Sequence, residues 1–229
     1  MHIGLIGGIG PAATEIYYRA LVKTYASANR KLELTIANAD AREMVANLEA
    51  GRQQAQAAIF ALHIDRLKAA GCEAVALTSM GAHFCIRSLA AISSLPLIDA
   101  VPALEDHFAA MGAARVGVLG TRAVMESGLY GLSGVDVVTV PHDALHATHA
   151  HYVSMAIRGS ASDEERAYFE HAALRLVEEE GVDAVVLGGT DLFLAFDQPG
   201  YPYTIVDCAL VHADKIARVG MGLEECPVQ

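Results

Sequence analysis

The sequence has no tryptophan, few charged residues and no cluster of basic residues. Of its 229 residues, 19% are charged, and 16 basic residues stand against 27 acidic ones, for a formal net charge of −11. Such a chain would repel the phosphate backbone of a nucleic acid. An anionic small molecule would therefore have to be held by a local cluster of hydrogen-bond donors, against the average field of the protein.

Long apolar runs and closely paired cysteines are also lacking. No run of about 18 apolar residues is present, so we expect no membrane-spanning helix, and the first residues lack the basic region of a signal peptide. The 53% of hydrophobic residues excludes intrinsic disorder. The four cysteines show no CxxC spacing, so we expect reduced thiols in a cytoplasmic protein. They are Cys72, Cys85, Cys208 and Cys226.

Short apolar runs alternate with alanine-rich amphipathic stretches along the chain. The apolar runs predict buried strands at 3–6, 32–37, 74–78, 116–119, 135–140, 184–187 and 204–206. The amphipathic stretches predict helices at 12–27, 55–70, 104–111, 163–180 and 210–219. Gly71 and Gly181 follow two of these helices, as glycines at helix ends do. The alternation predicts an α/β fold with parallel sheets covered by helices.

The chain also repeats itself. Three short segments recur in order at an offset of about 110 residues: 3–8 resembles 116–121, 71–77 resembles 181–187, and 97–100 resembles 205–208. We therefore expect two similar parallel-sheet α/β domains related by a pseudo-twofold axis, 1–100 plus 207–229 and 101–206. Ligands of parallel sheets bind beyond the carboxyl ends of the strands, so an active-site cleft is expected between the domains.

Glycines and hydroxyl side chains follow four of the predicted strands. Glycines let backbone N–H groups approach an oxyanion, and hydroxyls add further donors. Neither the P-loop nor the dinucleotide-binding glycine pattern is present. The composition therefore predicts a carboxylate site, built from 7–11, 78–81, 120–122 and 188–191.

Taken together, these segments resemble the aspartate/glutamate racemase family over essentially the whole chain. The matching residues are 4–11 with Thr14 and Tyr17, 117–121 with Ser127, 181–191, Asp207 and His212. The resemblance implies a two-domain α/β fold with the active site between the domains. It also implies proton transfer at the α-carbon of an amino acid or related acid, without a cofactor.

Both catalytic thiols of that family are replaced. Ser79 stands where the family has its first cysteine and Gly189 where it has its second, and the family's Asn-Thr pair is replaced by Met80 and Gly81. Inversion at carbon needs a base on one face of the substrate and an acid on the other. A serine hydroxyl is a far poorer base than a thiol, and glycine has no side chain. The two-thiol mechanism is therefore excluded.

The resemblance and the loops together give the candidate site residues. Ser79, His83 and Asp191 are the candidate catalytic groups. The alternatives are that Ser79 only fills the space of the thiol, that His83 is structural, and that Asp191 orients Thr190 or caps a helix. The candidate substrate-binding residues are Gly8, Gly10, Arg42, Thr78, Gly81, Thr121, Ser127, Gly189 and Thr190. Arg42 is expected to bind a second anionic group of the substrate, with Arg158 as a weaker candidate.

Three functions stay open. The first is cofactor-independent proton transfer at the carbon next to a carboxylate of an amino acid or dicarboxylic acid. The second is a lyase, decarboxylase or isomerase reaction on a related acid, and the third is binding without catalysis. No cofactor and no metal are expected, although the histidines of 142–151 could bind a metal if they shared a helix face. The expected partner is a small carboxylic-acid or amino-acid substrate, with no nucleic acid or membrane, and a homodimer is left open.

Overall fold

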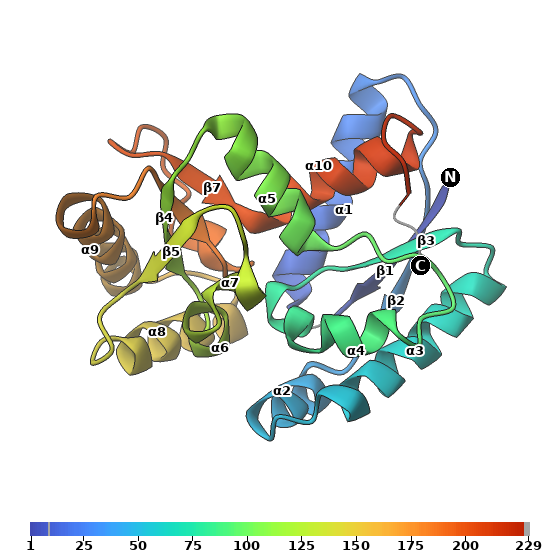
Figure 1. The fold of residues 1–229 in the computed structure, drawn as a ribbon, viewed down its shortest axis with the longest axis horizontal. Coiled ribbons are helices and arrows are strands. Elements are labelled where there is room, and N and C mark those ends of the chain that lie inside the picture. The colour runs from blue at the N-terminus through green and yellow to red at the C-terminus, as the bar shows by residue number, and fades with distance from the viewer. Residues whose placement is uncertain (9, 227–229) are drawn as a thin grey trace. The chain divides into compact units, whose positions relative to one another are not determined.

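A computed structural model describes residues 1–8 and 10–226. The chain forms two compact units, one of Met1–Asp99 with His212–Gln229 and one of Ala100–Val211. Each unit contains one parallel sheet (Figure 1), which confirms the predicted α/β fold with two parallel sheets. No helix in the described part of the chain is both long enough and apolar enough to cross a membrane.

The sheet of the first unit has three strands in the order β2-β1-β3. The strands are β1 (His2–Gly7), β2 (Glu33–Asn38) and β3 (Ala74–Leu77). The helices of this unit are α1 (Pro11–Ser27), α2 (Ala41–Glu49), α3 (Gln53–Ala69), the 3-10 helix η1 (Met80–Cys85), α4 (Ile86–Ala90) and the part of α10 (Cys208–Gly220) from His212 onward. A bridge between Val75 and Leu97 extends the sheet beyond β3.

The core of the first unit lies between the central strand β1 and helix α3, which run side by side in Figure 1. Phe60 and Ile64 of α3 are fully buried. A Cβ on Gly4 would lie 2.9 Å from Val75 Cγ1 and 3.0 Å from Leu67 Cδ1, so only glycine lets α3 approach the strand this closely. The absence of a side chain at Gly4 therefore leaves room for Leu67 of α3 against β1.

The sheet of the second unit has four strands in the order β5-β4-β6-β7. They are β4 (Arg115–Leu119), β5 (Asp136–Thr139), β6 (Ala184–Leu187) and β7 (Ile205–Asp207). The helices are α5 (Ala100–Met111), α6 (Arg122–Glu126), α7 (Gly128–Gly131), α8 (Leu145–Arg158), α9 (Asp163–Glu180) and the 3-10 helix η2 (Leu192–Leu194). Helix α9 packs along β4, where Leu176 lies over Gly117.

Two of the predicted strands are not buried. Strand β2 alternates between exposed and half-buried residues, and Ile36 is 41% exposed. Strand β5 is likewise half-exposed. Both strands lie at an edge of their sheet. The prediction of buried strands was therefore wrong for these two, because an apolar run does not distinguish an edge strand from a central one.

Candidate active site

The candidate residues gather at the carboxyl ends of the strands within each unit. Because all strands of a sheet are parallel, the loops after them emerge at the same edge. In the first unit this edge carries Gly8, Thr78 and Ser79. In the second unit it carries Thr121 and the segment 188–191.

The first of these loops is held by hydroxyl groups. Gly8 N–H donates to Thr14 Oγ1 at 3.0 Å, and Thr14 Oγ1 lies 3.1 Å from Thr78 Oγ1. The buried Thr78 hydroxyl also donates to the Ile6 carbonyl at 3.2 Å. Gly8 has φ +87°, and a Cβ there would lie 2.7 Å from the Ala39 carbonyl oxygen. Gly8 and Thr78 were predicted to donate to a substrate, but these contacts use their hydrogens to shape the loop.

Gly10 is the N-cap residue of helix α1. It is the residue before the helix, in an extended conformation, and its carbonyl accepts the Thr14 N–H at 3.0 Å. Its own role toward a substrate stays a prediction.

Ser79 lies between β3 and η1. It is 7% exposed and extended, and its hydroxyl makes no capping bond to η1. A Cβ on Gly81 would lie 3.5 Å from Ser79 Oγ, which is an ordinary contact. Position 81 thus has room for a side chain beside the serine hydroxyl. Met80, in contrast, is fully buried and belongs to the core.

His83 contacts Ser79 through the backbone and not through the hydroxyl. Its Nδ1 donates to the Ser79 carbonyl at 2.8 Å, and its Nε2 lies 3.4 Å from Asp99 Oδ1. A carbonyl only accepts, so Nδ1 carries a hydrogen and Nε2 is the nitrogen that faces the carboxylate. Burial lowers the pKa of His83, and the Asp99 carboxylate opposes this. This geometry favours a structural role for His83 over that of a base for Ser79.

His212, which matches the family pattern, joins three segments of the first unit. Tyr17 Oη donates to its Nδ1 at 2.9 Å, and its Nε2 donates to the Ile98 carbonyl at 2.7 Å. Burial lowers the pKa of His212 to about 3. The imidazole is therefore a neutral, fully buried link between α1, the segment before α5, and α10.

In the second unit, the glycines are needed for close backbone packing. Gly188 and Gly189 donate their N–H groups to the Leu119 carbonyl at 2.8 and 3.3 Å. A Cβ on Gly120 would lie 2.8 Å from the Gly189 nitrogen. The sequence suggested that these N–H groups were open to an oxyanion. The structure instead uses two of them to join the loops after β4 and β6.

Asp191 is held by Tyr152, a residue that was not among the candidates predicted from the sequence. Tyr152 of α8 donates its hydroxyl hydrogen to Asp191 Oδ2 at 3.0 Å, and both residues are buried. Thr190 beside them is also buried. Burial and the Asp191 carboxylate raise the pKa of Tyr152 well above its usual value. The only hint in the sequence was the glycine at 189. Because protein interiors are close-packed, the volume of the side chain that glycine lacks had to be filled by a neighbouring residue, here Tyr152.

Thr121 and Ser127 hold the loop after β4. Thr121 Oγ1 accepts the Val124 N–H at 3.3 Å, and Ser127 Oγ accepts the Tyr130 N–H at 3.1 Å. The Ser127 hydroxyl donates to the Val124 carbonyl at 3.2 Å. Leu129 and Tyr130 have positive φ, which costs about 1–3 kcal/mol for each such residue. Strained backbone of this kind is typical of binding loops, and the predicted binding role of both hydroxyls stays a prediction.

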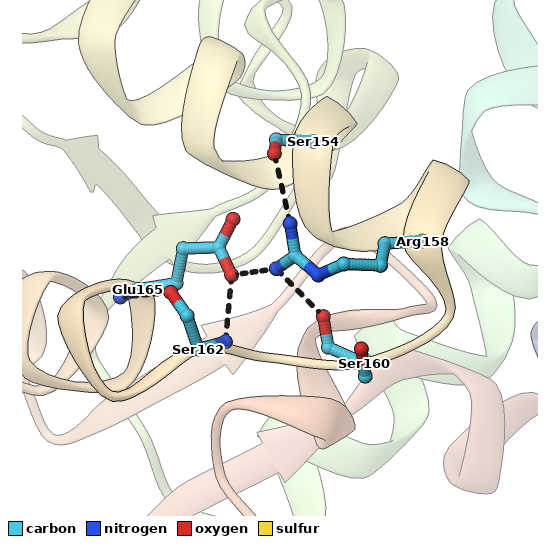
Figure 2. Close-up of polar contacts among 5 residues, drawn as sticks. All are labelled: Ser154, Arg158, Ser160, Ser162 and Glu165. Carbon is cyan, nitrogen blue, oxygen red and sulfur yellow. Dashed lines mark hydrogen bonds and ion pairs between the residues drawn. The ribbon is translucent and has the colours of Figure 1, made fainter.

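The two arginine candidates differ strongly. The Arg42 side chain, at the start of α2, is 96% exposed and lies 3.8 Å from Asp40. Arg158 lies among the polar groups of the α8–α9 turn (Figure 2). Its guanidinium donates to Ser154 Oγ at 3.2 Å, to the Ser160 carbonyl at 2.9 Å and to the Glu165 carboxylate. An internal carboxylate thus already pairs with Arg158, and its expected role toward a second anionic group of the substrate stays a prediction.

Replacement of Arg158 by alanine should destabilise the protein by about 2 kcal/mol, because it leaves the buried Glu165 carboxylate with one charged donor fewer. Burial raises the pKa of Glu165, but hydrogen bonds from Ser162 and Arg158 outweigh it and lower the pKa overall. Chemical denaturation measures the loss, and Arg42→Ala serves as the control, with an expected effect under about 0.5 kcal/mol. Equal effects of the two substitutions would contradict this assignment.

None of the fully buried cysteines is a reactive thiolate. Cys85 donates its Sγ hydrogen to the Ala82 carbonyl at 3.4 Å, and burial raises its pKa to about 12. Burial also raises the pKa of Cys208 well above its usual value. Thiolate is the nucleophilic form of cysteine, so neither thiol is suited to replace the missing pair.

The histidines of 142–151 do not share one face. His142 precedes α8, His149 Nδ1 accepts the Arg122 N–H at 3.3 Å, and the His151 ring stacks on Tyr168 with centroids 4.2 Å apart. Among residues 1–8 and 10–226, no group of three or more His, Cys, Asp or Glu side chains could hold a metal ion. The alternative of a metal-binding helix face has no support in the described structure.

Each unit thus contains one parallel sheet with helices, and its candidate side chains lie at the carboxyl ends of the strands. The chain therefore belongs to the class of α/β proteins with two parallel sheets. The model of the Asp/Glu/hydantoin racemase family matches residues 6–216, and the chain belongs to this family. The resemblance found in the sequence is confirmed.

Solved structures of the family share the fold. The chain is similar to a candidate Asp/Glu racemase from Yersinia pestis, with 24% identity, a TM-score of 0.84 and coverage of 96% of this chain and 100% of that one. It is similar to an aspartate racemase homologue from Pyrococcus horikoshii OT3, with 24% identity, a TM-score of 0.79 and coverage of 96% and 99%. It is also similar to the Picrophilus torridus aspartate racemase, with 17% identity, a TM-score of 0.73 and coverage of 100% of this chain and 96% of that one.

Proposed function

We propose that the protein is an enzyme that moves a proton at the carbon next to a carboxylate of an amino acid or dicarboxylic acid, without a cofactor and without a thiol. Membership of the Asp/Glu/hydantoin racemase family supports a racemase-like function. The observation that carries the proposal is the buried carboxylate of Asp191 at the carboxyl end of β6, two residues from the family's second thiol position.

In this proposal Asp191 is the proton acceptor of the second unit. The Cα–H bond of the substrate breaks, its electron pair stays on carbon and spreads into the adjacent carboxylate, and the proton passes to an Asp191 oxygen. The proton then returns to carbon by the reverse step or exchanges with solvent. A carboxylate is among the side chains that act as general bases in such proton transfers.

Ser79 acts as a hydrogen-bond donor in the same proposal. A serine hydroxyl is too weak a base to remove the proton without a partner, and the hydrogen bond between His83 and Ser79 goes to the Ser79 carbonyl and not to the hydroxyl. The hydroxyl can instead donate to a carboxylate oxygen, where negative charge grows as the C–H bond breaks. Arg42, exposed at the start of α2, is the candidate for a second carboxylate of the substrate.

The proposal is tested by incubating the protein in deuterated water with a panel of amino acids and dicarboxylic acids. Mass spectrometry should detect deuterium at the α-carbon of at least one acid. Asp191→Asn should slow this exchange by about 100-fold or more, as loss of a general base does. Ser79→Ala should slow it by about 10- to 100-fold, and the exposed Asp143→Asn should leave it unchanged.

Two results would contradict the proposal. If the wild-type protein incorporates no deuterium into any acid of the panel, the chain is a binding protein or acts on another bond. If exchange occurs but survives Asp191→Asn, proton transfer is real and the assigned acceptor is wrong.

A further inference from the structure

In the second unit of the chain, Gly189 packs directly against the ring of Tyr152. A Cβ on Gly189 would lie 2.8 Å from Tyr152 Cζ, 2.9 Å from Cδ2 and closer still to Cε2. The ring therefore occupies the volume that any side chain at 189 would need. Gly189 does not have a positive φ, so ring packing and not backbone conformation requires glycine here.

The hydroxyl of the same ring points at a candidate catalytic group. Tyr152 Oη donates to Asp191 Oδ2 at 3.0 Å, from helix α8 to the loop after β6. Tyr152 is 7% exposed and Asp191 is 3% exposed. A buried hydrogen bond to a carboxylate is charge-assisted and is not weakened by competing solvent, so it holds the carboxylate in one orientation.

We propose that Tyr152 is the positioning residue for Asp191, and that it replaces the thiol side chain missing at 189 with a ring that fills its volume and a hydroxyl that fixes the neighbouring carboxylate. This inference rests on the proposed function. During the reaction the substrate proton passes to Asp191, while Tyr152 keeps its own proton and only donates the hydrogen bond. The high pKa of Tyr152, caused by burial and by the carboxylate, agrees with a phenol that stays protonated.

The arrangement also explains why the chain carries no thiol at 189. A cysteine there would displace the ring and break the hydrogen bond to Asp191. The two solutions, a thiol at 189 or a tyrosine beside a carboxylate, exclude each other in this loop. The predicted requirement is therefore that glycine at 189 and tyrosine at 152 occur together.

The test is Tyr152→Phe in the full chain, assayed by α-deuterium exchange with the acid that the wild-type protein accepts. Phenylalanine keeps the ring packing and removes only the hydroxyl. We expect kcat to fall at least tenfold, while KM stays within about twofold, because orientation of the acceptor affects the chemical step and not binding. Thermal unfolding verifies that the variant is folded.

Tyr168→Phe is the matched control. Tyr168 belongs to α9, and its hydroxyl lies 2.8 Å from Oγ1 of Thr148, which belongs to α8 as Tyr152 does. The substitution therefore also removes a tyrosine hydrogen bond at α8, but one that does not involve Asp191. It should leave kcat unchanged. Gly189→Ala is the second variant. Its Cβ displaces the Tyr152 ring while both Tyr152 and Asp191 keep their side chains, and it should also lower kcat.

The outcomes separate this inference from the proposed function. A wild-type kcat in both Tyr152→Phe and Gly189→Ala would overturn the role of Tyr152 while leaving proton transfer established. An equal fall of kcat in Tyr168→Phe would also overturn it, because the effect would then be one of general packing. Absence of exchange in the wild-type protein would refute the proposed function, and the role of Tyr152 with it.

Discussion

Gly189→Cys is expected to destabilise the protein by about 3 kcal/mol, because the new side chain and the buried Tyr152 ring cannot occupy the same volume. Ser79→Cys is expected to cost less than about 1 kcal/mol, since sulfur replaces oxygen in a loop where no capping bond is lost. Chemical denaturation of the two single variants measures both effects.

The matched variant for this prediction is Gly189→Cys combined with Tyr152→Ala. Removing the ring opens the space that the cysteine needs, so the two substitutions together should cost clearly less than the sum of their separate effects. Strict additivity would show that Gly189 and Tyr152 do not compete for volume. Equal costs for Gly189→Cys and Ser79→Cys would contradict the packing account as well.

Acid is expected to destabilise the protein through His212. Burial lowers the pKa of His212 in the folded state to about 3, below the value near 6.5 of an exposed histidine. Between these two values the unfolded chain binds a proton that the folded protein does not bind. The free energy of unfolding should therefore fall as the pH decreases from about 6.5 to 3, by about 1.4 kcal/mol per pH unit from this group.

The contribution of His212 is isolated by comparing the wild-type protein with His212→Gln. The variant loses stability at pH 7, because the links to Tyr17 and to the Ile98 carbonyl are disturbed. The difference in free energy of unfolding between the two proteins should shrink by about 3 kcal/mol between pH 6.5 and pH 4. The reason is that only the wild-type chain has a histidine at 212, which binds a proton in the unfolded state and not in the folded state. A constant difference between the wild type and His212→Gln across this range would contradict the assignment.

Much of the fold could be predicted because its signals are local. Helix α9 begins and ends where the sequence indicates, since Ser162 and Glu165 form a capping box and Gly181 adopts φ +66° after the last turn. Strand β6 coincides with its apolar run. The edge strand β2 was misjudged because the position of a strand within a sheet depends on partners that are distant in the sequence.

The site was harder to predict because its decisive contacts are not local. Helix α8 was not predicted, since its histidines do not form the apolar pattern of a packed helix. The contact from its Tyr152 to Asp191 joins residues that are far apart in the chain. Arg158 looked like a free cation in the sequence, and only the packing of the α8–α9 turn brings Glu165 to it.

The most direct test of the central claim uses a variant in which all four cysteines are replaced by alanine. The claim is that this chain moves a proton next to a carboxylate with groups other than thiols. Incubated in deuterated water with the panel of acids, the folded variant should incorporate α-deuterium within about twofold of the wild-type rate, because no buried thiol takes part. Loss of exchange in the folded variant, with exchange retained in the wild-type protein, would show that a cysteine is catalytic and would contradict the account.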